Sequence, residues 1–246
     1  MPSVSRIVET TAELRGDAIA TAMTSAEIIE RVMDRGELLL LKGAFPEDML
    51  VSLRQAVADW GRDTALAEVD DFRANYHRRR AMVSRLQQAP HVFHDYNFND
   101  LAAAPRELRR KLEGVFEPLR RLYNQLTGYG VTFDLPAAGP YVHPQLIHYP
   151  SGGGFFARHW HNLLPQKLGF IVSLARRGRD YRNGGTGFAI EGEIVELEGL
   201  HDIGDILVWR YDHPHWVTQS DLADKFDWTS DAGRWVATFA YFDPKG

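Results

Sequence analysis

Residues 145–161, with the sequence QLIHYPSGGGFFARHWH, contain two strand-like runs separated by a turn. Gln145–Tyr149 and Phe155–His161 are rich in aliphatic and aromatic residues, and the proline and glycines between them favour a turn. Similar runs follow at Gly169–Ala175, Gly187–Ile190, Glu193–Leu197, Asp205–Tyr211, Trp216–Gln219 and Arg234–Phe242. Eight short runs over about 100 residues, with turn-forming residues between them, predict a β-sandwich or a small barrel.

The sequence pattern of the first half of the chain predicts helices instead of strands. A capping-box pattern and two prolines followed by helical periodicity give three expected helices, from Thr24 to Gly36, from Pro46 to Trp60 and from Pro105 to Leu126. Pro118 is expected to kink or split the third helix. Glu37–Lys42 predicts a short buried strand, and residues 63–104 give no firm prediction.

Helices followed by strands predict an α+β fold. We expect a single domain over residues 1–246, in which a mainly helical region, 1–139, packs on a β core, 140–246.

The composition excludes several kinds of site. The 246 residues include no cysteine, so a disulfide framework, a thiolate nucleophile, an iron–sulfur cluster and a cysteine-type zinc site are all excluded. With 28 Lys and Arg against 33 Asp and Glu, the net charge is −5, which gives no electrostatic case for nucleic acid or an anionic membrane. The N-terminus has no signal-peptide pattern, and the longest apolar run, Leu38–Leu41, is too short to span a membrane. The expectation is a cytoplasmic protein.

Three histidines form a candidate metal site. His159 and His161 lie two residues apart in one expected strand, so their side chains can share one face of it. His215 lies beside another expected strand. A single histidine in a strand is more often simply hydrogen-bonded. An H-x-H pair with a further histidine in a cysteine-free β domain favours a metal with open coordination positions.

Several segments of the chain resemble Fe(II)/2-oxoglutarate-dependent dioxygenases. Residues 145–159 are similar to the approach to the first iron ligand, and GGTGF at 184–188 to a glycine-rich hairpin of that family. GDILVW at 204–209 with HWV at 215–217 resembles the strand pair that carries the distal histidine. RWVATFAYF at 234–242 is similar to the last core strand, and residues 36–46 to the first strand of the core. These matches occur in the family's order.

The resemblance implies a double-stranded β-helix, which is a jelly-roll, cupin-like core. Iron would be held by His159, His161 and His215, and 2-oxoglutarate would be clamped by Arg234, whose planar guanidinium suits a carboxylate. Tyr149 is expected beside the co-substrate, and the expected substrate pocket includes Trp160, Asn162 and Trp209. The implied reaction uses molecular oxygen to oxidise, and by expectation hydroxylate, a small molecule.

Two basic runs bear on the charge of that substrate. Residues 77–80 (HRRR) and 176–179 (RRGR) are typical of solvated surfaces. Their functional interpretation is recruitment of an anionic substrate.

Two features depart from the family pattern. The family triad is H-x-D/E…H, a set of two histidines and a carboxylate, whereas His161 occupies the carboxylate position here. Iron would then have three neutral ligands, or His161 would not coordinate and water or halide would take the position, as in related halogenases. Arg234 also lies farther from His215 than is usual, and the insert Ser220–Gly233 would form a loop near the mouth of the cavity.

Other functions remain open at this point. Gly153, His159 and His161 fit the first cupin motif, although Gln166 occupies its glutamate position, so a 2-oxoglutarate-independent three-histidine iron dioxygenase is one alternative. A zinc hydrolase or lyase that uses the same histidines is another. The third is a non-catalytic barrel that binds a small ligand.

Overall fold

The computed structural model describes residues 6–70, 73–82, 89–133 and 140–242. Its helices are α1 (Ser25–Ile29), continued by a π-helical turn (Glu30–Asp34), α2 (Glu47–Asp63), a 3-10 turn (Leu101–Ala103) and α3 (Arg106–Thr127). Its strands are β1 (Ile7–Arg15), β2 (Ala18–Thr21), β3 (Leu38–Lys42), β4 (Asn75–Met82), β5 (His91–Phe98), β6 (Tyr141–Pro150), β7 (Gly154–His159), β8 (Leu168–Ser173), β9 (Thr186–Ile190), β10 (Glu193–Glu196), β11 (Ile206–Arg210), β12 (His215–Ser220) and β13 (Gly233–Phe242).

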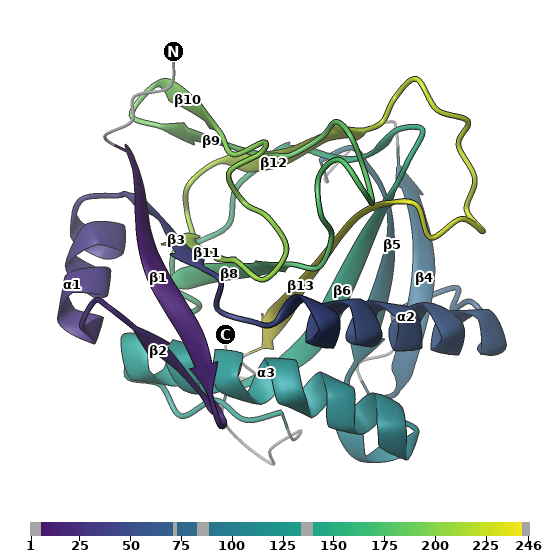
Figure 1. The fold of residues 1–246 in the computed structure, drawn as a ribbon, viewed down its shortest axis with the longest axis horizontal. Helices are drawn as coiled ribbons and strands as arrows, with labels where there is room; N and C mark the ends of the chain where they lie inside the picture. The colour runs from purple at the N-terminus through teal and green to yellow at the C-terminus, as the bar shows by residue number, and fades with distance from the viewer. Residues whose placement is uncertain (1–5, 71–72, 83–88, 134–139, 243–246) are drawn as a thin grey trace.

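The strands form a double-stranded β-helix, as predicted. Their order is β10-β9-β12-β7-β5-β6-β13-β8-β11-β3-β1-β2, and β4 pairs with β5 off this path. Strand β5 pairs with both β6 and β7, so it joins the short sheet β7-β12-β9-β10 to the long sheet. Figure 1 shows α2 and α3 along one side of this assembly, with α1 beside β1.

Two apolar layers hold the elements together. The helices pack on the outer face of the long sheet, and a second group of buried side chains fills the space between the sheets. Strand β3 contributes to both layers because Leu39 and Leu41 face the helices, while Leu38 and Leu40 face the interior. A strand buried on both faces requires a continuous apolar run, which explains its sequence.

The eight strands expected in the second half are β6 to β13, with ends shifted by a few residues. The capping box at α1 is also present, since the Thr24 side chain accepts from the Glu27 N–H, and the Glu27 carboxylate accepts from the Thr24 N–H at 2.7 Å. Helix α3 continues through Pro118, so the expected split is absent. No helix in the described part of the chain is long and apolar enough to cross a membrane.

The prediction that residues 1–139 are mainly helical was only partly right, because this half also contributes β1 to β5. Strand β4 lacks an apolar pattern. It pairs with β5 along its whole length, and Arg80 adds ion pairs with Asp95 of β5 at 2.8 Å and with Asp70 at 2.7 Å. Strand β1 lies parallel to β3, a pairing between distant segments that local sequence does not specify.

Gly169 in β8 provides a test of this packing. A Cβ atom there would lie 2.2 Å from Cε2 of Trp209, whereas one at Gly130 would meet no atom within 4 Å. We expect Gly169→Ala to lower the free energy of unfolding by about 1–3 kcal/mol through overpacking. Gly130→Ala should change it by less than about 0.5 kcal/mol. Urea denaturation of both variants measures the difference, and equal stabilities would contradict the described packing of Trp209.

Candidate metal centre

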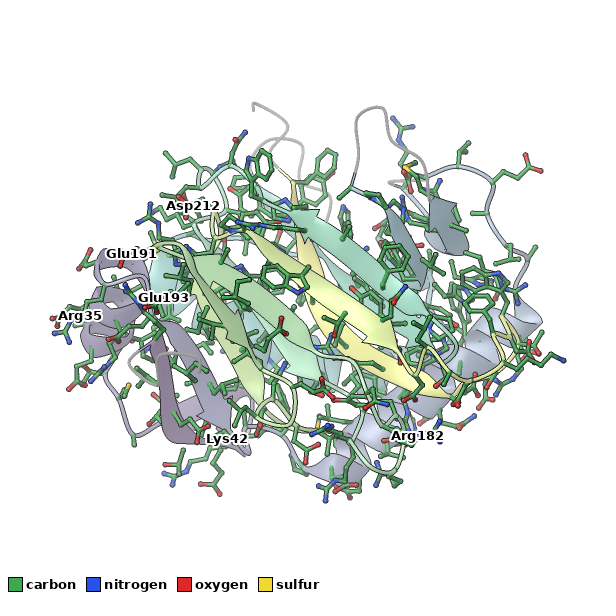
Figure 2. All side chains as sticks on the ribbon, turned by 90° about the horizontal axis from the view of Figure 1, so that it is seen from above. Arg35, Lys42, Arg182, Glu191, Glu193 and Asp212 are labelled. Atoms are coloured by element: carbon green, nitrogen blue, oxygen red, sulfur yellow. The ribbon has the colours of Figure 1, made fainter. Side chains whose placement is uncertain are left out.

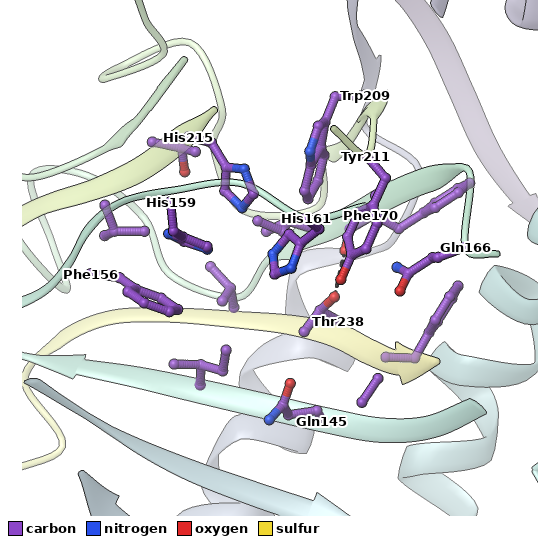
Figure 3. A pocket seen from close by; sticks show the side chains of 18 of the residues that line it. Gln145, Phe156, His159, His161, Gln166, Phe170, Trp209, Tyr211, His215 and Thr238 are labelled. Atoms are coloured by element: carbon purple, nitrogen blue, oxygen red, sulfur yellow. Dashed lines mark hydrogen bonds between the residues drawn. The ribbon is translucent and has the colours of Figure 1, made fainter. Parts of the chain in front are cut away.

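Strand pairing brings the three histidines together. His159 is the last residue of β7, His215 is the first residue of β12, and the two are directly opposite in the antiparallel register. His161 lies two residues beyond the end of β7, so the loop places it, not the strand alternation that the sequence predicted. One ligand atom from each histidine lies within 4.8 Å of the others. Figure 3 shows the three rings on one side of the cavity.

Backbone carbonyls fix the orientation of two of the rings. Nδ1 of His159 lies 2.9 Å from the carbonyl oxygen of Ala157, and Nδ1 of His215 lies 2.9 Å from that of His213. A carbonyl oxygen can only accept, so Nδ1 carries the proton in each ring and Nε2 keeps a free lone pair. Metal-binding histidines commonly have this arrangement, because the partner of the second nitrogen fixes the tautomer.

The third ring is held by stacking. The His161 ring lies 4.4 Å from the Tyr211 ring, nearly parallel at 7°, and is perpendicular to the His159 ring. Burial, with a smaller contribution from the nearby His159, lowers the pKa of His161 to about 4 and that of His215 to about 3. Burial also lowers the pKa of His159. Neutral imidazole is the form that binds a metal ion, so the cluster is in its binding form at neutral pH.

A cavity of about 180 Å³ adjoins the cluster. Its walls are mainly aromatic and aliphatic, with a few neutral polar side chains: Gln145, Ile147, Tyr149, Phe156, His159, His161, Gln166, Gly169, Phe170, Ile171, Thr186, Trp209, Tyr211, His215, Val217, Val236, Thr238, Phe239 and Ala240. Trp209 packs edge-on against His215 with ring centroids 5.4 Å apart, and its indole N–H has no hydrogen-bond partner among the residues that the structure describes.

Arg234 is buried beside this cavity without an acidic partner among the described residues. Only 2% of its surface is exposed. Nη2 donates to the Thr186 hydroxyl at 2.6 Å, and the guanidinium lies 6.0 Å from the centre of the Tyr149 ring. Nη1 has no hydrogen-bond partner in the described part of the chain. Thr186 and Tyr149 both line the cavity. Since an uncompensated buried charge costs several kcal/mol, this position suits an anionic ligand.

The other predicted site residues divide into two groups. Tyr149 and Trp209 line the cavity, whereas Asn162 lies in a neighbouring open cleft and Trp160 is 70% exposed outside both spaces. The predicted loop between β12 and β13 exists, but none of its residues lines the cavity. It contacts β4, where the carbonyl of Trp228 accepts a hydrogen bond from Arg79.

Sequence analysis missed several residues that line the cavity. Thr186 lies within the GGTGF segment that was identified, although no role was assigned to it. Gln145 and Thr238 lie in segments that resemble the family, and Gln166 was considered only as a position of the cupin motif, but none of them was assigned to the cavity, and neither was Tyr211.

Comparison with known proteins supports the fold. No protein-family model and no curated protein matches the sequence. Among solved structures, a Pseudomonas putida prolyl-4-hydroxylase is 14% identical, with 90% of this chain and 99% of that chain covered at a TM-score of 0.56. EctD from S. alaskensis with bound Fe is 16% identical, with 98% and 83% covered at a TM-score of 0.53.

The non-heme alpha ketoglutarate dependent epimerase SnoN from nogalamycin biosynthesis is 12% identical, with 88% of this chain and 82% of that chain covered at a TM-score of 0.53. At these identities the likeness shows the fold alone, which is the double-stranded β-helix of these oxygenases.

Metal titration tests the histidine cluster. We expect the protein to bind one Fe(II) or Co(II) ion, and His215→Ala to weaken that affinity at least about tenfold because it removes an oriented ligand. His143→Ala is the matched control, since His143 is equally buried but lies outside the cluster. Isothermal titration under anaerobic conditions gives both affinities. Equal affinities in the two variants would contradict a metal site at this cluster.

Proposed function

We propose that the protein is a non-haem Fe(II) oxygenase that uses 2-oxoglutarate and molecular oxygen to hydroxylate a small molecule. One observation carries the proposal: a cluster of three imidazoles and a buried arginine, which has no acidic partner among the described residues, adjoin one cavity. The three imidazoles suit a divalent transition metal, and the buried arginine suits the distal carboxylate of a dicarboxylic acid. Trp160, Asn162 and Trp209 remain proposed substrate contacts.

The protein's own residues would bind and orient the reactants. His159, His161 and His215 would hold the iron, and their carbonyl and ring partners keep the imidazoles in place. Arg234 would fix one end of 2-oxoglutarate, with Thr186 and Tyr149 beside it. Bound iron would supply the activation of oxygen and of the oxo acid, so that one oxygen atom would enter succinate as CO₂ is released and the other would enter the substrate.

A three-histidine dioxygenase that does not use 2-oxoglutarate is the second candidate. It is favoured by the absence of a carboxylate among the residues of the described cluster. Arg234 argues against it, because a reaction without a dicarboxylate leaves this buried cation uncompensated.

Oxygen consumption separates these functions. We expect the Fe(II)-loaded protein to consume oxygen and release succinate and CO₂ only when 2-oxoglutarate is present. Oxygen consumption that ignores 2-oxoglutarate would favour the second candidate. No metal-dependent turnover with any oxo acid would favour a non-catalytic barrel.

Substitution of His161 tests whether this residue belongs to the metal site. His161→Asp would recreate the H-x-D…H pattern, and we expect it to retain metal affinity and to maintain or increase decarboxylation of 2-oxoglutarate. His161→Asn is the matched control because asparagine has the shape of aspartate without its charge. We expect this variant to bind the metal at least about tenfold more weakly than the unsubstituted protein. Metal affinity that is unchanged in both variants would place residue 161 outside the coordination sphere.

Arg234→Met tests the carboxylate clamp. Loss of the buried cation should weaken 2-oxoglutarate binding at least about 30-fold, equivalent to roughly 2 kcal/mol. Pyruvate is the matched ligand, since it has the oxo acid but no distal carboxylate, and its affinity should not change. The thermal midpoint of the ligand-free variant should be unchanged or higher, because the substitution removes an uncompensated buried charge. Equal losses for both ligands would show that Arg234 is not the clamp.

A further inference from the structure

A second, more open cleft adjoins the metal cavity. Its volume is about 400 Å³, against about 180 Å³ for the cavity. His161, Gln166 and Tyr211 line both spaces and therefore form the wall where they meet. The rest of the cleft is lined by Asn162, Leu164, Pro165, Tyr241 and Phe242. A molecule that reaches the cluster from this side passes Tyr211.

Neither space is lined by a charged side chain from the described residues. Away from Arg234, an ionised group buried there would lose its hydration without gaining a counter-ion, which is strongly unfavourable. Arg234 donates to Thr186 in the cavity wall, and the proposed function assigns it to the co-substrate. Figure 2 shows labelled charged residues such as Arg35, Glu191 and Arg182 at the periphery of the molecule.

The basic runs of the sequence do not supply the missing charge. Arg78 and Arg80 pair with acidic residues, and the same holds for Arg176, Arg177 and Arg179. The carboxylates that pair with them are Asp70, Asp95, Asp180, Asp202, Glu47 and Glu198. Arg79 is exposed, donates to the carbonyl of Trp228 and lines neither space. Most of the basic residues therefore form ion pairs on the protein itself, which weakens the interpretation of these runs as recruiters of an anionic substrate.

Hydrogen-bond acceptors line the inner end of the cavity. The Thr238 hydroxyl donates its proton to the carbonyl oxygen of Phe170 at 2.7 Å, so its own oxygen can still accept. The amide nitrogen of Gln145 donates to Asn97 at 3.1 Å, which leaves the Gln145 carbonyl oxygen as an acceptor. Figure 3 shows both side chains across the cavity from the histidines. Such acceptors suit a neutral group that donates, such as a hydroxyl.

The outer cleft suits an apolar ring. Leu164 is 63% exposed at its edge, and the flat face of Tyr211 is held by its stacking on His161. Pro165, Tyr241 and Phe242 add further apolar surface. Exposed apolar side chains gathered beside a cavity are typical of a ligand-binding surface.

We propose that the substrate is an uncharged, hydroxyl-bearing ring compound. Its hydroxylated end enters the cavity past Tyr211 and reaches Thr238 and Gln145, while its larger apolar part lies in the cleft beside Leu164 and Pro165. Naming this ligand as the substrate rests on the proposed function, but its binding requires neither iron nor 2-oxoglutarate.

Binding of three matched probes to the metal-free protein tests this proposal. The probes are 4-hydroxybenzyl alcohol, which is neutral, 4-hydroxybenzoate, which is an anion, and tyramine, which is a cation. We expect the neutral probe to bind at least about tenfold more tightly than either ion, measured as dissociation constants by saturation-transfer NMR. Similar affinities for all three probes, or no binding of any probe at millimolar concentration, would overturn the proposal.

Two exposed leucines locate the binding. Leu164→Arg places a cation at the cleft, and we expect it to raise the affinity for 4-hydroxybenzoate about fivefold or more and to leave tyramine excluded. Leu222→Arg is the matched control, since Leu222 is 60% exposed on the β12–β13 loop and lines neither space. Equal effects of the two substitutions would contradict binding in the cleft.

Thr238→Val tests the inner end of the cavity. This substitution keeps the shape of the side chain but removes the acceptor. It should weaken binding of the neutral probe about fivefold and leave the binding of toluene, which has no hydroxyl group, unchanged. An equal loss for both compounds would contradict the role of the acceptor. Failure of these tests leaves the oxygen-consumption experiment unaffected, and absence of turnover leaves these binding results unaffected, so the two proposals can fail separately.

Discussion

The antiparallel pairing of β7 with β12 is the constraint on which the site depends. It places His159 directly opposite His215, at the adjoining ends of the two strands, and the backbone carbonyls that orient both rings belong to the same short segments. A register slip by one residue would turn either histidine to the other face of the sheet. The cluster is therefore a product of the β-helix itself, and only His161 depends on a loop.

Arg234 relates the cavity to the energetics of the fold. The long sheet positions this residue at the start of β13, where β6 carries Tyr149 as its direct partner. Its one side-chain hydrogen bond leaves part of the guanidinium unpaired in the interior. Such an unpaired buried cation lowers the free energy of unfolding when no anion is bound, and binding of an anionic ligand raises it again. The metal cluster and the arginine thus point to two ligands in one cavity.

Local sequence predicted most of the C-terminal half because those strands alternate or run apolar between turn residues. It did not predict β4, which has no apolar alternation and pairs along its whole length with β5, and it did not predict the parallel pairing of β1. His159 and His161 were identifiable because they lie two residues apart, and His215 because its segment resembles the family strand with the distal histidine. Tyr211 and Thr238 were not, since only the folded β-helix brings their segments to the same cavity.

The most direct test is an anaerobic crystal structure with Fe(II) and 2-oxoglutarate, with anomalous diffraction recorded at the iron absorption edge. The predicted result is a single iron peak bonded to His159, His161 and His215, with the distal carboxylate of 2-oxoglutarate paired with Arg234. An iron peak elsewhere, or a 2-oxoglutarate molecule that does not contact Arg234, would contradict the proposed oxygenase site.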